Sequence, residues 1–381
     1  MSSIQTSAAE LRDLLVSWAE INSGSSNSEG LSRMCSALRT EFGRLPGAAA
    51  EVVPLGPGLP QALRVRARPE APLHVLLCGH FDTVYGPEDP FQRCRFPDPH
   101  TLNGPGVADM KGGLVVMLAA LRAFEASEQS CRLGWEVLLT PDEEIGSAGS
   151  APLFAEAARR HRLALVFEPA RANGDLVRGR MGTGIFTATA RGRAAHAGRD
   201  PKAGRNAILA LAEFLPLTEG IKGDLMINVG SIRGGGAVNI VPDFAQAEIN
   251  VRVTRREDQD SVLERLRERA APINAREGFS LQIEGRFNRP PKEITPVEER
   301  LFEAWRDCGR EAGAHFSWQD VAGGSDGNLL AAAGLPCLDG LGVVGDHLHS
   351  PREVIRVSSL AERAQVAALF LSRLERGDIP L

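Results

Sequence analysis

The sequence predicts an α/β fold: a mostly parallel sheet covered by helices on both faces, with an inserted β-α-β-β-α-β two-layer domain. Strand and helix patterns alternate in the first half, change near Arg180, and resume after a stiff Arg289-Pro290-Pro291 segment. The 381 residues are also too many for one ordinary core. We therefore expect one domain formed by residues 1–179 and 289–381, interrupted by a second domain of residues 180–288.

The first segment contains short apolar runs separated by helical patterns. The spacing of its early apolar residues predicts an amphipathic first helix, and this stretch lacks the features of a signal peptide; the residues are Leu11, Leu14, Leu15, Trp18 and Ile21. Strands are expected at 73–79, 135–139 and 163–167, and helices at 112–125 and 151–160. Strands that alternate with helices in this way indicate a parallel sheet.

The inserted segment combines strand alternation with two helical patterns. Its expected order is strand 184–191, helix 206–217, strands 226–232 and 245–253, helix 258–271 and strand 279–285. Three more helices follow the proline segment, at 296–312, 327–333 and 360–374. The insertion is long enough for a small independent domain.

Charge and composition exclude several classes of partner. The chain has 43 basic and 48 acidic residues, and a net charge of −5 gives no electrostatic basis for binding nucleic acid or an anionic membrane surface. No run approaches 18 apolar residues, so we expect no membrane-spanning helix. The six cysteines form no Cys-x-x-Cys pair, which indicates reduced thiols in a cytoplasmic protein.

Polar clusters follow the strands of the predicted parallel sheet, where functional groups of such sheets collect. The clusters are His80 with Asp82, Asp109, Glu143 with Glu144, and Glu168, and a fifth cluster in the C-terminal segment contains His347 and His349. Imidazoles with carboxylates suit Zn²⁺ or a similar divalent ion. Five plausible ligands exceed the needs of one tetrahedral zinc, which points to two metals that share a carboxylate.

Each cluster alone also has an ordinary explanation. A His-x-Asp pair can lie on the surface, Asp109 can cap the helix that follows it, and adjacent glutamates can match a helix dipole. Glu168, which precedes a proline, can be a turn residue. The metal hypothesis is favoured because all four clusters fall at strand ends of one inferred sheet. The glycine-rich stretches match neither a Walker loop nor a dinucleotide-binding fingerprint.

Six motifs together resemble the co-catalytic zinc amidohydrolases, the group that contains glutamate carboxypeptidase, acetylornithine deacetylase, succinyl-diaminopimelate desuccinylase and aminoacylase. The motifs are His80-Phe-Asp-Thr-Val84, Gly104-Pro-Gly-Val-Ala-Asp-Met-Lys-Gly-Gly113, Thr140-Pro-Asp-Glu-Glu-Ile-Gly146, Phe167-Glu-Pro169, Ala195-His-Ala-Gly198 and Gly323-Gly-Ser-Asp326. Within the group the chain looks most similar to the folate-hydrolysing glutamate carboxypeptidases. The resemblance runs in order from about residue 75 to 355.

The resemblance implies a role for each residue of the metal site. Asp109 would bridge two Zn²⁺ ions, for which Co²⁺ or Mn²⁺ could substitute. The remaining ligands would be His80 and Glu168 on one ion, and Glu144 and His349 on the other. Glu143 would be the general base, and Asp82 would orient His80. The peptide bond from Asp109 to Met110 is a candidate for the cis form.

The resemblance also implies residues that contact the substrate. The inserted domain would be a lid and a dimerisation domain, whose His196 stabilises the oxyanion in the partner subunit's active site. The other implied contacts are Asn239, Arg252, Gly324, Ser325 and Asp326, with Arg252 pairing with an α-carboxylate. On pattern alone, His196 could be an ordinary turn histidine and Arg252 could form a salt bridge on a strand face. His347 is a rival to His349 as ligand, and its role is open.

The expected reaction is hydrolysis of an amide that links an acyl group to an amino acid with a free α-carboxylate. The substrate would be a small N-acyl amino acid or peptide, and the enzyme a cytoplasmic homodimer joined through the lid. One alternative is deacetylation or desuccinylation of a biosynthetic intermediate. The other is a non-catalytic binding protein on the same scaffold, which the full set of candidate ligands and Glu143 disfavours.

Overall fold

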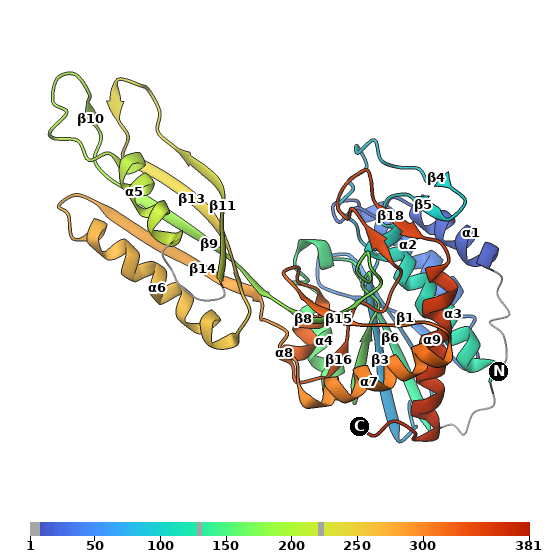
Figure 1. The fold of residues 1–381 in the computed structure, drawn as a ribbon. Helices are drawn as coiled ribbons and strands as arrows, with labels where there is room; N and C mark the ends of the chain where they lie inside the picture. The colour runs from blue at the N-terminus through green and yellow to red at the C-terminus, as the bar shows by residue number, and fades with distance from the viewer. Residues whose placement is uncertain (1–7, 128–131, 220–224) are drawn as a thin grey trace. The chain divides into compact units, whose positions relative to one another are not determined.

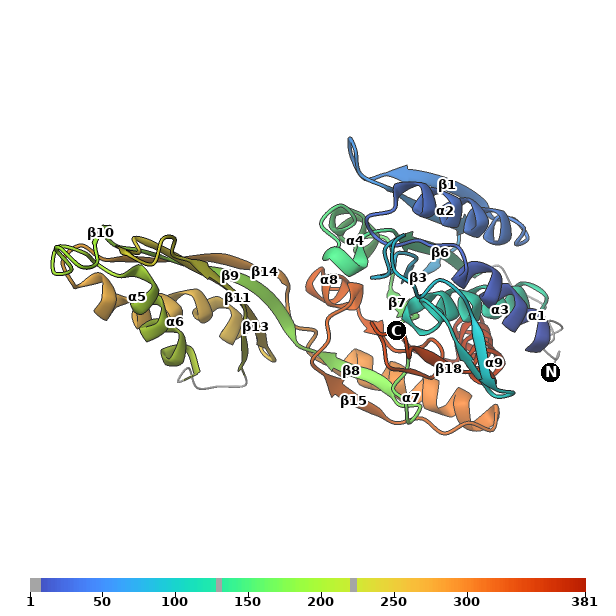
Figure 2. The same ribbon diagram turned by 90° about the horizontal axis from the view of Figure 1, so that it is seen from above.

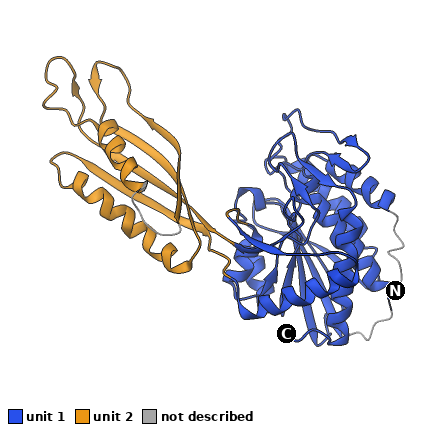
Figure 3. Cartoon of the chain, viewed as in Figure 1, with its two compact units in different colours: residues 1–179, 294–321, 325–381 blue, residues 180–293, 322–324 orange. Residues whose placement is uncertain are grey.

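The computed structural model describes residues 8–127, 132–219 and 225–381, which form two compact units. The first unit comprises residues 1–179, 294–321 and 325–381, and the second comprises residues 180–293 and 322–324 (Figure 3). The short return of residues 322–324 to the second unit had no signal in the sequence. Each unit has its own sheet and its own hydrophobic core.

The first unit is built on a six-stranded sheet (Figure 1). The strand order is β1 (Ala49–Pro54), β2 (Gln61–Ala67), β6 (Leu133–Thr140), β3 (Leu73–His80), β7 (Leu163–Val166) and β16 (Cys337–Leu338). Strands β6, β3, β7 and β16 run parallel, whereas β1 and β2 form an antiparallel edge. The predicted mostly parallel sheet is therefore confirmed, with an edge hairpin that had not been predicted.

Helices cover both faces of this sheet, as Figure 2 shows from above. One core cluster contains side chains of α1 (Ala8–Ala19), α2 (Ser28–Phe42), α3 (Gly112–Glu125), α7 (Pro296–Glu311) and α9 (Ser359–Arg376). A separate cluster contains those of α4 (Ala151–Ala158) and α8 (Asp326–Ala332). On β3, Leu77 joins the first cluster while Leu76 joins the second, because successive side chains point to opposite faces.

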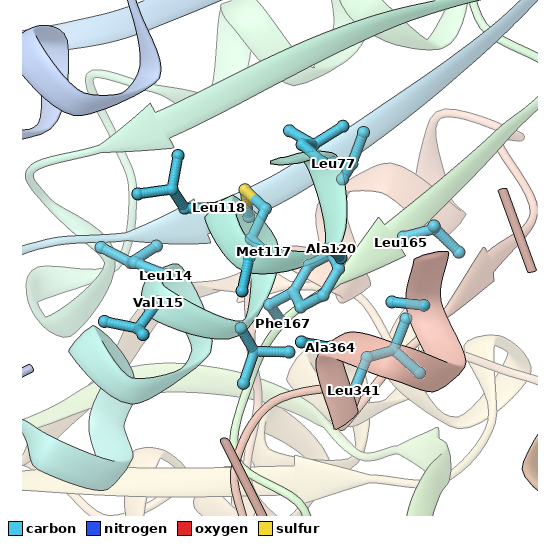
Figure 4. Close-up of a cluster of buried hydrophobic side chains, with 14 of the residues drawn as sticks. Leu77, Leu114, Val115, Met117, Leu118, Ala120, Leu165, Phe167, Leu341 and Ala364 are labelled. Atoms are coloured by element: carbon cyan, nitrogen blue, oxygen red, sulfur yellow. The ribbon is translucent and has the colours of Figure 1, made fainter. Parts of the chain in front are cut away.

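The centre of the larger core is α3, an almost entirely buried helix. Figure 4 shows side chains of α3 together with Leu77 of β3, Leu165 of β7 and Ala364 of α9, which all belong to this cluster. A helix that is apolar on all sides belongs inside a domain, and here it begins directly after the segment that carries Asp109.

Smaller elements connect this core to the candidate site. A four-stranded sheet joins β4 (Arg95–Asp98), β5 (Thr101–Asn103), β17 (Gly345–Asp346) and β18 (Val354–Arg356). A second small sheet pairs β8 (Leu176–Arg180) with β15 (Trp318–Val321). Two short helical turns, η1 (Val107–Lys111) and η2 (Glu143–Ile145), complete the set.

The second unit has the predicted β-α-β-β-α-β order. Its antiparallel sheet has the strand order β11 (Leu225–Gly234), β13 (Phe244–Val253), β9 (Gly182–Arg191) and β14 (Ser280–Arg289). Helices α5 (Ala207–Glu219) and α6 (Arg256–Asn274) pack on one face, so the core has two layers. A separate two-residue pairing joins β10 (Ala195–His196) to β12 (Ile240–Val241).

Two further expectations concern the cysteines and the possibility of a membrane-spanning helix. Free thiols are found at Cys35, Cys78, Cys94, Cys308 and Cys337, and Cys131 lies outside the described residues. Among the described helices, none has the length and apolar character needed to cross a membrane.

Close packing of α3 gives a first prediction. At Gly113, in the first turn of α3, a Cβ atom would stand 1.9 Å from the carbonyl oxygen of Phe167. We expect Gly113→Ala to lower the free energy of unfolding by about 3 kcal/mol, because this backbone contact has no flexible group that can yield. Intrinsic helix propensity works the other way and favours alanine by about 1 kcal/mol. Thermal unfolding of the variant and of the wild-type protein measures the difference in their free energies of unfolding.

The matched control for this substitution is Gly86→Ala. A Cβ atom at Gly86 meets nothing within 4 Å, so we expect a change within about 0.5 kcal/mol. Equal melting temperatures for the two variants would contradict the close approach of α3 to the end of β7.

Candidate metal centre

The candidate site lies at the carboxyl ends of three neighbouring parallel strands. His80 is the last residue of β3, Glu144 lies in η2 after β6, and Glu168 is the second residue after β7. Asp109 differs from the expectation, because it lies in η1 between β5 of the small sheet and α3 rather than at the end of a main-sheet strand. His349 also comes from outside the main sheet, in the segment between β17 and β18.

The carboxylate of Asp109 is shared between two groups of side chains. Its Oδ1 lies 3.1 Å from Nε2 of His80, and its Oδ2 lies 3.2 Å from Nε2 of His349. Glu168 Oε1 lies 3.8 Å from Nε2 of His80, and Glu144 Oε2 lies 3.2 Å from Nε2 of His349. The two groups therefore each contain one imidazole, and Asp109 belongs to both.

This donor set fits a pair of divalent cations. Ligand atoms of His80, Asp109 and Glu144 lie within 4.8 Å of one another. Imidazole nitrogen with carboxylate oxygen suits zinc and similar ions, and one carboxylate with its two oxygens directed to different groups suits a bridge. The structure thus brings together all five residues that were expected as ligands, and their role as ligands remains a proposal.

The electrostatics of the cluster favour positive charge within it. Burial opposes protonation of His80, but hydrogen bonds to Asp109 and Asp82 and the charge of Glu168 raise its pKa well above 6.5. Hydrogen bonds to Asp109 and Glu144 raise the pKa of His349 to about 11. Burial and the charge of Asp109 also raise the pKa of Glu144. Clustered carboxylates of this kind stabilise any cation placed between them.

Asp82 connects His80 to the adjacent glutamates. Nδ1 of His80 lies 3.3 Å from Oδ1 of Asp82 and 3.1 Å from its main-chain oxygen, which leaves Nε2 for the cluster. The buried Asp82 carboxylate also accepts the backbone N–H groups of Glu143 and Glu144, each at 3.1 Å, and the hydroxyl of Ser25 at 2.8 Å. Asp82 therefore contacts two segments that carry expected ligands, that of His80 and that of Glu144. The sequence had indicated only the contact with His80.

His349 and its rival His347 lie in one tight turn. Both have a φ of 57°, a left-handed conformation that is uncommon for residues other than glycine. The backbone N–H of His347 donates to Asp346, and its carbonyl oxygen accepts the hydroxyl of Ser350. His349 is the one whose ring reaches the carboxylates.

The peptide bond from Asp109 to Met110 is cis, as expected.

Ser325 and Asp326 are buried and hydrogen-bonded inside the first unit. Ser325 caps α8 and donates to Asp339 at 3.1 Å. The Asp326 carboxylate accepts the hydroxyls of Thr140 and Ser147, at the two ends of the turn that carries Glu143 and Glu144. These contacts hold the turn, while a substrate contact for either residue, or for Gly324 of the second unit, stays a prediction.

The hydrogen bonds of His196 in the second unit fix which ring nitrogen carries the proton when the ring is neutral. Nδ1 of the exposed His196 accepts the backbone N–H groups of Gly198 and Arg199, both at 3.1 Å. In the neutral ring the proton is therefore on Nε2, which makes that nitrogen a donor. The main-chain oxygen of Asn239 accepts the N–H of Ala197 at 2.9 Å, so these two segments are neighbours within the second unit. The turn contacts of His196 are compatible with either of its expected roles.

Arg252 uses part of its guanidinium within the second unit. One terminal N–H donates to the carbonyl oxygen of Ala322 at 2.5 Å, and Nε–H donates to the side-chain oxygen of Asn250 at 3.2 Å. These acceptors are neutral. Arg252 thus fixes the short segment 322–324 to the unit.

Sequence reasoning missed three residues that support the cluster: Tyr85, Lys111 and Glu353. All three are buried beside the segment of Asp109. Nζ of Lys111 donates to the main-chain oxygen of Ile21 at 2.8 Å, and burial lowers the pKa of Lys111 to about 7. Glu353 was noted only as part of the family pattern after His349-Ser350 that favours His349 over His347, and Lys111 only as a member of the motif 104–113; no supporting role was inferred for either residue or for Tyr85.

Comparisons with known proteins show what the chain is similar to. The profile of Peptidase family M20/M25/M40 matches residues 76–373. Carboxypeptidase G2 of Pseudomonas sp. (strain RS-16) is 28% identical over 367 residues, which cover 94% of this chain and 87% of that protein. A succinyl-diaminopimelate desuccinylase of Xanthomonas oryzae pv. oryzae is 31% identical over 328 residues, covering 80% and 84% respectively.

A solved structure has the same fold. Aminopeptidase PepT from Bacillus cereus superposes with a TM-score of 0.81 at 21% identity, covering 97% of this chain and 99% of that one.

The two neighbouring histidines give the second prediction. We expect the wild-type protein, loaded with Zn²⁺, to hold about two ions per chain, and His349→Ala to hold about one, because one group loses its imidazole. His347→Ala alters the same turn without touching the carboxylates, so its metal content should equal that of the wild type. Elemental analysis by mass spectrometry measures both. An equal loss in the two variants would contradict the ligand assignment.

Proposed function

This chain belongs to peptidase family M20/M25/M40, and from that premise we propose that it is a metallo-hydrolase that cleaves the amide bond between an acyl group and an amino acid with a free α-carboxylate. The observation that carries the proposal is the shared carboxylate of Asp109, with His80 on one oxygen and His349 on the other. The similarity of this chain to carboxypeptidase G2, which covers 94% of this chain, supports the same chemistry.

The residues that would hold two Zn²⁺ ions are His80, Asp109, Glu144, Glu168 and His349, and Co²⁺ or Mn²⁺ are possible substitutes. Bound ions of this kind lower the pKa of water and polarise a carbonyl group, which prepares both partners of a hydrolysis. The fit of the donor set supports this assignment, because two imidazoles and three carboxylates converge without a thiolate.

Glu143 is the proposed general base. Its backbone N–H donates to Asp82, as does that of Glu144, so its main chain is fixed directly beside that of a proposed ligand. Glu143 would take a proton from the attacking water and return it to the leaving amine, which restores the carboxylate for the next turnover.

His196 and Arg252 would act on the substrate from the second unit. Nε2–H of His196 is a donor suited to the developing oxyanion. The guanidinium of Arg252 would bind the α-carboxylate, the planar group that its paired N–H donors match. Asn239, Gly324, Ser325 and Asp326 are proposed to complete the substrate site.

We propose further that the protein is a cytoplasmic homodimer joined through the second unit. A groove of about 900 Å³ lies between α5 and β11, lined by apolar residues that include Leu211, Leu215 and Ile232. Strand β11 is an edge strand, so one side of its backbone is open to another chain. A second copy of this unit would cover both features.

A second candidate reaction is desuccinylation or deacetylation of a biosynthetic intermediate. The observation that favours it is the 31% identity to the desuccinylase over most of both chains. The two reactions share every proposed catalytic residue and differ in the acyl group and the amino-acid side chain.

Glu143→Gln gives the third prediction. The amide keeps the shape of the side chain but cannot accept the proton of water, so kcat should fall by about 10²–10⁴-fold or more while about two ions remain bound. Turnover is measured on N-acyl-glutamate and folyl-glutamate, and on N-succinyl-diaminopimelate and N-acetylornithine. We expect kcat/KM to be highest for the glutamate amides.

The outcomes separate the candidates. Higher kcat/KM for the succinyl or acetyl substrate would favour the second reaction, and an active Glu143→Gln protein would reject Glu143 as base. Wild-type enzyme that hydrolyses none of these amides with Zn²⁺, Co²⁺ or Mn²⁺ would refute the proposed function.

The fourth prediction tests whether His196 acts across subunits. Glu143→Gln and His196→Ala homodimers should each be weakly active, but mixing them in equal amounts should raise activity toward about a quarter of the wild-type value, because random exchange makes about half of the dimers mixed. A mixed dimer then has one site with an intact Glu143 that receives an intact His196 from its partner. Mixtures no more active than the two parents, although mass spectrometry detects mixed dimers, would show that His196 acts within its own chain or not at all.

A further inference from the structure

Glu353 is a completely buried carboxylate that lies four residues after His349 and directly before β18. Its Oε1 accepts the backbone N–H groups of Ala108 and Asp109, at 2.8 and 3.0 Å. Its Oε2 accepts the backbone N–H of Gly106 at 3.3 Å and the hydroxyl of Tyr85 at 2.8 Å. Four donors thus converge on one side chain, and three of them belong to the turn that presents Asp109.

These backbone donors need an acceptor because their turn is irregular. Gly106 is left-handed with a φ of 70°, and Asp109 has a φ of −114° and a ψ of 94°, outside the helical range. The N–H groups at the start of a helix have no partner within it, and burying them without an acceptor is costly. A carboxylate is a stronger acceptor than a neutral oxygen, so Glu353 holds this turn in place of regular helical bonds.

The same residue is also fixed to the segment of His349. Its backbone N–H donates to Ser350 at 2.9 Å, and the hydroxyl of Tyr85 lies 3.0 Å from the same carbonyl oxygen. Glu353 therefore links the segment of one imidazole to the turn of the shared carboxylate.

We propose that Glu353 is a positioning residue of the metal centre, which sets the spacing between Asp109 and His349 and thereby the affinity for the metal pair. The inference rests on the proposed metal-dependent function. It assigns Glu353 no contact with metal or substrate. The link is direct, since His349 Nε2 lies 3.2 Å from Asp109 Oδ2 and both residues sit on segments that Glu353 joins.

The test uses Glu353→Gln in the full-length protein. Glutamine keeps the shape but replaces one oxygen with an NH₂ group, and because each oxygen accepts two donors, two of the four lose this acceptor. We expect the Zn²⁺ affinity of the metal-free protein, measured by competition with a chromophoric chelator, to fall about 10–100-fold. At saturating Zn²⁺, kcat should return to within about 3-fold of the wild type, since the ligands themselves are unchanged.

Two further variants separate positioning from general stability. Asn103→Ala removes the amide that holds the main chain of Glu353 and Pro351 but leaves the carboxylate contacts, so it should lower the melting temperature without weakening Zn²⁺ binding. Tyr85→Phe removes one donor of four and should weaken Zn²⁺ binding less than Glu353→Gln does.

Tyr85 also provides a reporter, because it is the single tyrosine of the chain. Protein labelled with 3-fluorotyrosine should show one ¹⁹F resonance that shifts when Zn²⁺ is added to the wild-type sequence. In Glu353→Gln the shift should require about 10–100-fold more Zn²⁺, in step with the weaker affinity.

Unchanged Zn²⁺ affinity in folded Glu353→Gln, or an equal loss of affinity in Asn103→Ala, would overturn the proposal. If Glu353→Gln does not fold, Tyr85→Phe decides: a weaker Zn²⁺ affinity supports the proposal and an unchanged one rejects it. The chelator measurement uses no substrate, so metal-binding protein that hydrolyses none of the tested amides would refute the proposed function while leaving this inference intact.

Discussion

Carboxylates that are buried side by side repel one another unless positive charge lies between them, and this constraint organises the first unit. Asp109, Glu144 and Glu168 converge at one edge of the sheet, with an imidazole set against each oxygen of Asp109. Such a cluster is costly in a low-dielectric interior when it is unpaired. The same arrangement would bind divalent cations, whose positive charge would offset this cost. The requirement for positive charge therefore explains both the composition of the site and its proposed dependence on metal.

Two other buried carboxylates support the cluster in a similar way without joining it. Asp82 accepts the backbone N–H groups of Glu143 and Glu144, and Glu353 accepts those of Ala108 and Asp109. In each case a side chain from one segment fixes the main chain of another, which sets the position of a ligand more firmly than side-chain packing could. The candidate metal centre is thus supported by hydrogen bonds to the backbone, and the apolar core of the first unit includes side chains of the neighbouring strands and of α3.

Much of this arrangement could be predicted from the sequence, for identifiable reasons. Apolar runs located β3, β6 and β7, and the rule that functional groups follow parallel strands then located His80, Glu144 and Glu168. Asp109 and His349 lie off the main sheet, so their residue types placed them among the candidate ligands, whereas the strand-end rule does not account for their positions. The supporting role of Glu353 was missed because three of its four donors are backbone N–H groups, which every residue type except proline supplies. The sequence did not reveal that residues 322–324 belong to the second unit, because this depends on contacts such as that of Arg252 with Ala322.

The discontinuity of the first unit has a consequence for the newly made chain. Glu168 is synthesised roughly 180 residues before His349, a delay on the order of ten to forty seconds at ribosomal speeds of about 5–20 residues per second. During that interval the second unit, which is continuous apart from residues 322–324, can complete its sheet, while β7 still lacks β16 and α3 still lacks the cover of α9. At this stage the nascent protein lacks His349, one of the proposed metal ligands, and α9 does not yet cover the apolar surface of α3. We expect its dependence on chaperones and on metal binding to be greatest during this interval, before α9 has been synthesised.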